Sequence, residues 1–417
     1  MPSFRDLSVS RRRFIQFLAA SPLFAGSAGA ALAQSLLPRQ KYSDPVTWWP
    51  HDPGALIKDP KEAISVFDFE PVMRQNVPPA HFGYMASGVN DEMTLRANRE
   101  GFARFQLRPR RLVDVSKVDM SVEILGVRYD SPIVLAPVGG QKAFHPEGEV
   151  AAARGAKPGN HLQILSTVTT SGVEDVAAAR GAPIWYQLYA SNNWEIARAL
   201  VRRAEKAGCR AVAVTVDIMG NRIQDTQRRL ELSDTRACTS CHDRSTPQTN
   251  LRRRLMYEDI DVTGIGASTA MTWDFFKRLR DTTRMKILVK GLLAHEDAKL
   301  AADFGLDGII VSNHGGRGED SGRSTIDALP EMLEAVGGRI PVLVDSGFRR
   351  GTDIVKALAM GAQGVCIGRP YLWGLGAFGQ AGVERVLELL RIELRIAMQQ
   401  VGAPTVKHLV PAMVRRA

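Results

Sequence analysis

The chain has 417 residues, of which 45% are hydrophobic and 24% are charged. This composition is typical of a soluble globular protein, and the length fits one large α/β barrel with insertions. The formal net charge is +10. No long basic run interleaved with aromatic side chains accompanies this charge, which argues against nucleic acid as a partner and favours an anionic substrate, surface or redox partner.

Residues 1–33 predict a twin-arginine export signal. Arg11 and Arg12 precede a short apolar stretch, Phe17–Leu32, and the segment ends in Ala31-Leu32-Ala33, a small-residue cleavage pattern. The stretch is low in large hydrophobic residues, so an uncleaved membrane anchor is the weaker alternative. The signal holds four Arg and one Asp, which is +3 of the total charge and leaves the mature chain near +7. We predict a periplasmic protein, exported folded with a tightly bound cofactor.

Residues 34–80 are rich in Pro and Trp and predict an irregular arm packed on the main domain, with one amphipathic piece at Lys61–Arg74. From about residue 130, eight apolar runs alternate with helical patterns. The runs are Ile133–Ala136, Gln163–Ser166, Ile184–Leu188, Ala211–Val216, Lys286–Val289, Gly308–Val311, Pro341–Val344 and Gly364–Ile367. The helical segments include Glu149–Gly155, Trp194–Ala207, Trp273–Arg280, His295–Phe304, Ile326–Val336 and Thr352–Met360.

This alternation indicates a parallel sheet covered on both faces, and eight units indicate a closed (β/α)8 TIM barrel. An open doubly wound sheet is the alternative, but no Gly-x-Gly-x-x-Gly follows the first strand. The mature domain is expected to span residues 34–417. Residues 218–267, after the fourth strand, are polar, basic and without clear periodicity, which predicts a lid loop or a disordered insertion. Cys209 and Cys366 lie in apolar runs and are expected to be buried.

Polar residues follow five successive predicted strands. They are Thr215 and Asp217, then Lys290, then Ser312 to Arg317, then Asp345, Gly347 and Arg349, and finally Gly368 and Arg369. Because active sites of such barrels lie at the carboxyl ends of the strands, these residues predict one site. The Gly and Arg residues after strands seven and eight suit a phosphate. His314 suits a base oriented by Asp217, Arg317 a carboxylate, and Lys290 a developing anion.

The chain resembles the FMN-dependent L-2-hydroxy-acid dehydrogenase and oxidase family from about Val66 to Leu409. The motifs that carry the resemblance are Tyr84-Met-Ala-Ser-Gly88, Leu135-Ala-Pro-Val-Gly139, Gln187-Leu-Tyr189, Leu288-Val-Lys-Gly291, Ser312-Asn-His-Gly-Gly-Arg317 and Asp345-Ser-Gly-Phe-Arg-Arg-Gly-Thr-Asp353. The family includes glycolate oxidase, lactate oxidase and the membrane and cytochrome-linked lactate dehydrogenases. Resemblance also implies a homotetramer.

The resemblance implies a role for each site residue. His314 removes a substrate proton while paired with Asp217, and two electrons pass to the flavin. Tyr84, Arg222 and Arg317 bind the substrate carboxylate, Tyr189 contacts its hydroxyl, and Lys290 stabilises the reduced flavin. The residues expected to line the flavin ring are Pro137, Val138, Gly139, Ser166, Gln187, Thr215 and Ser312. Those expected to hold the ribityl chain and phosphate are Asp345, Gly347, Arg349, Gly368 and Arg369.

Three positions depart from the family pattern. Ile-Met-Gly-Asn separates Asp217 from Arg222, so the assignment of Arg222 depends on a small gap, with a solvated loop arginine as the alternative. Val168 stands where glycolate oxidases carry Trp, which favours lactate or a larger substrate. Gly139 stands where oxidases usually carry Ala. Glycine there is typical of members that use a quinone or cytochrome as acceptor.

Cys238-Thr-Ser-Cys241-His242, in the predicted lid, matches a c-type haem attachment site, with His242 as an axial ligand. A disulfide or a shared metal site are the alternatives. We therefore expect an L-lactate-type dehydrogenase that passes electrons to a quinone or cytochrome. The alternatives are an oxygen-using oxidase that forms hydrogen peroxide and a flavin electron-transfer protein without turnover.

Overall fold

The centre of the fold is a parallel sheet of eight strands in the order β4-β11-β10-β9-β8-β7-β6-β5. Its strands are β4 (Ile133–Leu135), β5 (Ile164–Ser166), β6 (Trp185–Tyr189), β7 (Ala211–Thr215), β8 (Lys286–Leu292), β9 (Gly308–Val311), β10 (Val342–Val344) and β11 (Gly364–Ile367). A parallel bridge between Leu135 and Gln163 joins the first strand to the last. The sheet therefore closes, and the predicted (β/α)8 barrel is confirmed.

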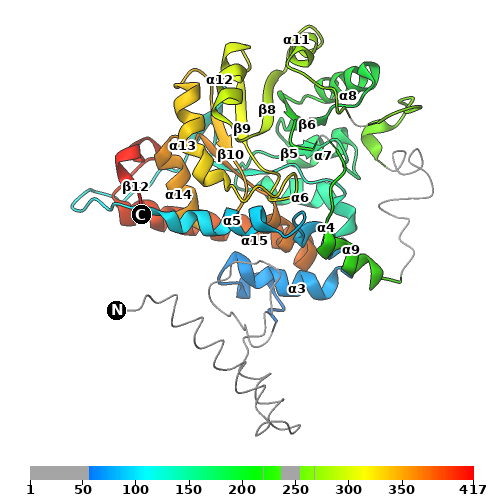
Figure 1. Ribbon diagram of the computed structural model, residues 1–417. Coiled ribbons are helices and arrows are strands. Elements are labelled where there is room, and N and C mark those ends of the chain that lie inside the picture. Colours follow the sequence, from blue (N-terminus) through cyan, green and yellow to red (C-terminus); the bar gives the residue numbers. More distant parts are fainter. Residues whose placement is uncertain (1–55, 219, 236–253, 267) are drawn as a thin grey trace, which may run out of the picture. The chain divides into compact units, whose positions relative to one another are not determined.

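The structure is a computed structural model that describes residues 56–218, 220–235, 254–266 and 268–417. Helices follow the barrel strands and surround them (Figure 1). They are α6 (Gly148–Ala156), α7 (Val173–Arg180), α8 (Trp194–Lys206), α9 (Asp225–Leu232), α11 (Asp274–Arg280), α12 (His295–Asp303), α13 (Thr325–Val336), α14 (Gly351–Met360) and α15 (Arg369–Val401). None of these described helices is both long and apolar enough to cross a membrane.

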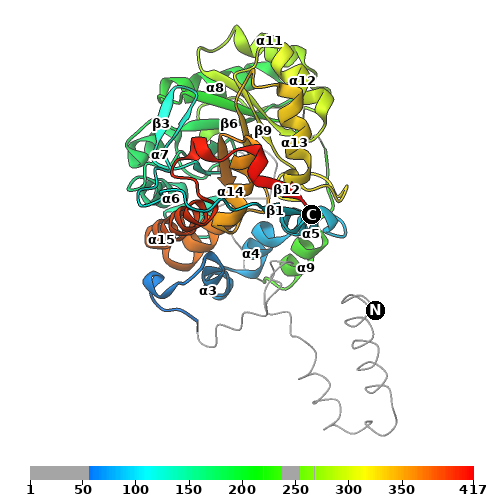
Figure 2. The same cartoon turned by 90° about the vertical axis from the view of Figure 1, so that its left-hand side faces the viewer.

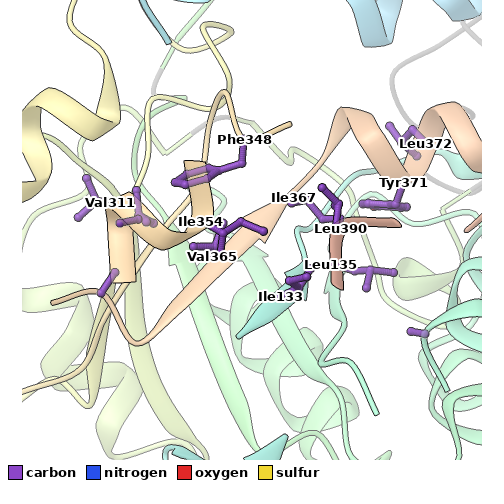
Figure 3. Packing of buried hydrophobic residues seen from close by; sticks show 14 of the residues in the cluster. Ile133, Leu135, Val311, Phe348, Ile354, Val365, Ile367, Tyr371, Leu372 and Leu390 are labelled. Atoms are coloured by element: carbon purple, nitrogen blue, oxygen red, sulfur yellow. The ribbon is translucent and has the colours of Figure 1, made fainter. Parts of the chain in front are cut away.

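Alternate residues of each barrel strand enter different apolar clusters. Val134 and Cys366 face the inner cluster of the barrel, whereas Ile133, Leu135 and Ile367 join the outer cluster with the surrounding helices. Figure 3 shows Ile133, Leu135 and Ile367 beside side chains of α15. Burial on both faces explains why each strand reads as a continuous apolar run rather than an alternating one. The predicted burial of Cys209 and Cys366 is confirmed.

Segments at both ends of the chain complete the barrel. The N-terminal helices are α3 (Phe69–Asn76), α4 (Pro79–Ala86) and α5 (Met93–Glu100), and the short strands are β1 (Phe105–Leu107), β2 (Val122–Ile124), β3 (Val127–Tyr129) and β12 (Val414–Arg416). The described part of the predicted arm packs on the barrel, with α3 against α15 (Figure 2). Strand β12 pairs with β1 in antiparallel register.

The sequence predicted a lid loop or a disordered insertion after β7, but part of this segment is helical. It contains α9 and the 3-10 helix η6 (Leu255–Tyr257). Helix α9 packs on α4, where a Cβ on Gly83 would lie 3.0 Å from Leu230 Cδ1. No residue of α9 is fully buried, so no strong apolar period marks this helix in the sequence. The predicted haem motif at Cys238, Cys241 and His242 lies outside the described residues.

Candidate active site

One pocket, of about 740 Å³ including its open mouth, lies at the carboxyl ends of the barrel strands. It is lined by residues that the sequence predicted: Tyr84, Pro137, Val138, Gly139, Tyr189, Lys290, His314, Arg317, Asp345, Gly347, Arg349, Gly368 and Arg369. The pocket is also lined by residues that were not assigned a role in the site from the sequence: Met85, Ala136, Gly315, Ser346, Phe348, Cys366, Ile367 and Leu372. Most of these are direct neighbours of predicted residues, so extending each strand-end motif by one residue would have found them.

The turn after β9 carries His314. His314, Gly315 and Gly316 all have positive φ, at 58°, 70° and 76°. Such left-handed backbone is easy for glycine and uncommon for other residues. A Cβ on Gly316 would lie 2.6 Å from Leu95 N, so the glycine also lets the turn pack against α5. The two glycines therefore allow the sharp turn that directs the imidazole into the pocket.

A reciprocal amide pair holds this turn. Asn98 Nδ2 donates to Asn313 Oδ1 at 2.9 Å, and Asn313 Nδ2 donates to Asn98 Oδ1 at 2.8 Å. Asn313 Oδ1 also accepts from Gly316 N at 3.1 Å. Both side chains are buried. Sequence reasoning missed Asn98 because it lies on α5, far from His314 along the chain, and nothing local marks it as part of the site.

His314 is held between two side chains. Its Nδ1 lies 2.8 Å from Asp217 Oδ1, and its Nε2 lies 3.1 Å from the Tyr189 hydroxyl. An ionised carboxylate can only accept a hydrogen bond, so Nδ1 carries the proton and Nε2 presents a lone pair. The predicted pairing of His314 with Asp217 is present in the structure. This arrangement can accept a proton at Nε2.

The charges of this pair follow from their surroundings. Burial raises the pKa of Asp217, but His314 and Lys290 outweigh that effect and bring its pKa below the ordinary value. Burial lowers the pKa of His314, Asp217 opposes the shift, and Lys290 and Arg317 lower it further, so the net pKa lies below the ordinary value. A neutral imidazole beside an ionised carboxylate is a competent base at neutral pH.

Lys290 lies between two buried carboxylates. Its Nζ is 3.3 Å from Asp345 Oδ2 and 3.7 Å from Asp217 Oδ2, and it donates to Ser312 Oγ at 2.7 Å. Burial lowers the pKa of Lys290, but Asp345 and Asp217 outweigh that effect and raise it above the ordinary value. The lysine is therefore a fixed positive charge that faces the pocket.

Two arginines, Arg317 and Arg222, lie close to Tyr189 and to each other. Arg317 Nη1 donates to the backbone oxygens of Tyr84 and Ser87, and its guanidinium carbon lies 4.6 Å from the Tyr84 ring centroid. Arg222 lies close enough to Tyr189 and Arg317 to act on the pKa of both. Its Nη1 is buried and has no hydrogen-bond partner among the described residues. Such a pair suits an anionic carboxylate.

Polar side chains of β5, β6 and β7 include buried atoms that have no partner among the described residues. Ser166 Oγ donates to Gln187 Oε1 at 3.0 Å. Gln187 Nε2 and Thr215 Oγ1 are buried and have no partner within the described part of the chain. An unsatisfied buried polar group costs free energy, so these two atoms fit the polar edge of a bound ring system.

The predicted phosphate glycines have different surroundings. A Cβ on Gly368 would meet only Val138 Cγ2, at 3.9 Å, so there is open space beside it. Gly368 directly precedes α15, whose first backbone amides favour an anion. A Cβ on Gly347 would lie 2.1 Å from Asn98 O. Glycine at position 347 is therefore also required for the packing of α5.

The two predicted phosphate arginines are both anchored within the protein. The Arg369 guanidinium donates to Met85 O and Gly315 O, each at 3.0 Å. The Arg349 guanidinium carbon lies 4.6 Å from the Trp373 ring centroid. Both side chains also line the pocket, so their cationic ends are available to an anionic group bound there.

The FMN-dependent dehydrogenase family matches residues 73–416. The chain belongs to this family. It is therefore an FMN-dependent oxidoreductase, and the unpaired atoms of Gln187 and Thr215 and the open space at Gly368 fit FMN as its cofactor.

Relatives and solved structures agree with this assignment and make the chain an FMN-dependent 2-hydroxy-acid oxidoreductase. The chain is 39% identical over 359 residues to a peroxisomal (S)-2-hydroxyacid oxidase of Arabidopsis thaliana, covering 85% of this chain and 97% of the relative. It is 40% identical over 369 residues to glycolate oxidase 1 of Oryza sativa subsp. indica, with 85% and 96% covered. The crystal structure of mandelate oxidase with (S)-2-phenylpropionate superposes with a TM-score of 0.75 at 36% identity, with 85% and 98% covered.

These relatives correct the predicted location. The sequence predicted export to the periplasm, but relatives similar over 85% of the chain are peroxisomal enzymes of plants. A short arginine and apolar pattern carries less weight than similarity over a whole domain, and residues 1–33 lie outside the described residues. The prediction of a periplasmic location is wrong by this comparison. The predicted haem c also gains no support from these relatives.

Proposed function

We propose that this enzyme oxidises the 2-hydroxy group of an (S)-2-hydroxy acid to a 2-oxo acid, with His314 as the base. The observation that carries the proposal is the placement of His314 Nε2, which faces the pocket while Asp217 holds Nδ1 at 2.8 Å. Asp217 fixes the tautomer and stabilises the imidazolium that forms when His314 takes a proton. FMN supplies the acceptor for the two electrons that leave the substrate.

The remaining residues orient the substrate. Arg317 and Arg222, with Tyr84, bind the carboxylate, because a guanidinium pairs with a carboxylate through two parallel hydrogen bonds. Tyr189 contacts the substrate hydroxyl, since its own hydroxyl lies 3.1 Å from His314 Nε2. Lys290 would supply a positive charge that stabilises the reduced form of bound FMN. The flavin ring, ribityl chain and phosphate are assigned to the residues that the resemblance implied.

The substrate carries a carbon side chain on C2, where glycolate has only a hydrogen atom. Val168 takes the place of a tryptophan in glycolate oxidases, and a smaller side chain leaves more room. Similarity to mandelate oxidase, whose crystal structures hold phenyl-substituted acids, also supports a larger substrate. We propose L-lactate and bulkier 2-hydroxy acids, including aromatic ones, as the substrate class.

Dioxygen is the proposed electron acceptor, because the similar relatives are oxidases. A dehydrogenase that reduces a quinone or cytochrome is the second candidate. Gly139 favours it, since glycine at this position is typical of members that react poorly with oxygen. The two candidates share the site and the first half of the reaction, and differ only in how the electrons leave.

Two measurements test the proposal. The holoenzyme is mixed without oxygen with glycolate, L-lactate and (S)-mandelate, and loss of the visible flavin absorbance is followed. We expect lactate or mandelate to bleach the flavin faster than glycolate, and no bleaching by any of them would refute the function. The reduced enzyme is then mixed with oxygen, a quinone analogue or cytochrome c. Rapid peroxide formation supports the oxidase, and reoxidation by the quinone or cytochrome alone supports the dehydrogenase.

A further inference from the structure

Two loops beside the pocket are tied into one unit. The loop after β4 holds Gly139 and Gly140, and the loop after β5 holds Val168. Gly140 N donates to Val168 O at 3.0 Å. The buried carboxylate of Glu149 accepts from the backbone of both loops, from Gln141 N at 3.0 Å and from the loop after β5 at 2.9 Å. Movement of either loop therefore displaces the other.

Arg254 reaches this unit from the segment after β7. Its Nη1 donates to Val168 O at 3.0 Å, so this one carbonyl oxygen accepts from both Arg254 and Gly140. A Cβ on Gly140, which has φ of 65°, would lie 3.0 Å from the same Nη1. The guanidinium thus lies against the backbone of both loops.

Arg254 is itself held in place. It directly precedes η6, in which Met256 is fully buried. The next residue, Leu255, accepts a hydrogen bond at its backbone oxygen from Arg203 Nη1 at 2.6 Å. Arg203 is in turn paired with Glu174 at 3.0 Å. The contact from Arg254 to Val168 therefore begins from an anchored backbone.

We propose that Arg254 is a positioning residue that holds Val168 against Gly139 and so sets the room beside the substrate. The carbonyl carbon of Val168 is bonded to the Cα that carries its side chain, so a fixed carbonyl oxygen also restricts the position of the side chain. Val168 Cγ2 lies 2.3 Å from the place where a Cβ on Gly139 would be, and Gly139 lines the pocket. The segment after β7 thereby influences which substrate side chains the enzyme accepts. That last step rests on the proposed function.

A double-mutant cycle tests the positioning role without any substrate. Gly139→Ala forces Val168 aside, and Arg254→Met removes the donor that resists this movement. We expect Gly139→Ala to lower the Tm of the holoenzyme less in the Arg254→Met background than in the wild type. Additive Tm shifts would overturn the proposal. If Arg254→Met does not fold, Arg254→Lys, which keeps one donor, is used in the same cycle and is expected to give a smaller coupling of the same sign.

Selectivity gives the second readout. Arg254→Met is expected to change the ratio of kcat/KM for (S)-mandelate over L-lactate about fivefold, as coupled neighbouring residues commonly do. The change is expected in KM rather than kcat. Arg254→Lys, which keeps one donor, is expected to change the selectivity ratio less than Arg254→Met does. Arg278→Met is the matched control, because Arg278 packs on Trp194 at 4.3 Å. An equal change in the control would refute the role. If no hydroxy acid bleaches the flavin, the proposed function fails, while the Tm cycle still decides on Arg254.

Discussion

Val168 fills the space that a side chain at Gly139 would need. A Cβ on Gly139 would lie 2.3 Å from Val168 Cγ2 and 3.0 Å from Val168 O. Two of the three positions that were identified from the sequence as departures from the family pattern are therefore in contact. Their substitutions are not independent, because the valine can approach only where a methyl group is missing.

The first prediction concerns this contact. Gly139→Ala overpacks a fixed loop and is expected to destabilise the holoenzyme by about 1–3 kcal/mol. Val168→Ala in the same chain removes the clashing Cγ2 and is expected to recover most of that loss. Urea unfolding followed by flavin fluorescence measures both variants. A double variant no more stable than Gly139→Ala would show that Val168 is not the residue that resists the methyl group.

The second prediction tests the base. His314→Gln keeps a polar side chain but cannot take a proton at neutral pH. We expect bound FMN to remain and the rate of flavin bleaching by substrate to fall by about 10²–10⁴-fold or more. Stopped-flow absorbance without oxygen measures the rate, and FMN titration of the apoprotein checks that binding is kept. Persistent fast bleaching would remove His314 from its proposed role.

The third prediction is the pH dependence. Burial, Lys290 and Arg317 hold the pKa of His314 below its ordinary value of 6.5, despite Asp217. The base must be neutral, so kcat/KM is expected to stay level as the pH falls to about 6.5 and to decline only below it. Asp217→Asn removes the charge that raises this pKa, so the decline moves to lower pH while the plateau drops. An unchanged profile in Asp217→Asn would contradict the coupling.

The fourth prediction concerns the buried lysine. Lys290→Met leaves the carboxylates of Asp217 and Asp345 buried without their cation, which is expected to cost about 3–5 kcal/mol of stability. Lys286→Met, at the other end of β8, removes an exposed pair with Asp307 and is expected to cost less than about 1 kcal/mol. Chemical unfolding of the two holoenzymes compares them. Equal losses would mean that the buried charges are stabilised by other groups.

The fifth prediction concerns Asn98. Asn98→Ala removes two hydrogen bonds from the buried amide of Asn313, which keeps its bonds to Arg323 O and Gly316 N, and the loss is expected to cost about 1–3 kcal/mol. The His314 turn loses its tether, so kcat is expected to fall while the pH profile keeps its shape. Asn76→Ala is the control, because Asn76 donates to Ala377 O away from the turn. Asn76→Ala is expected to lose stability without a comparable loss of kcat. An equal loss of kcat in both variants would show that Asn98 does not specifically position the His314 turn.

Several parts of the site were predictable because local patterns report them. A strand covered on both faces is a continuous apolar run, and the ends of the eight barrel strands lie within one residue of their predicted positions, except that β8 ends three residues later than predicted, at Leu292. Polar residues directly after those strands share one rim, so the sequence alone predicted that His314, Asp217 and Lys290 lie in one site. Helices α4, α5, α7, α9 and α15 were not among the helices predicted. Helix α7 is rich in alanine, α9 has no fully buried residue, and α15 joins two helices across a kink at Phe378 and Gly379.

The sequence by itself determined the barrel, its rim and the chemistry of the residues on that rim, because burial and strand-end position are local properties of the chain. Only the tertiary structure decided which loops touch. The approach of Asn98 to Asn313, of Val168 to Gly139, and of Arg254 to Val168 O each joins segments that are distant along the chain. No periodicity encodes such contacts, because they arise only when the closed barrel brings the carboxyl ends of different strands together.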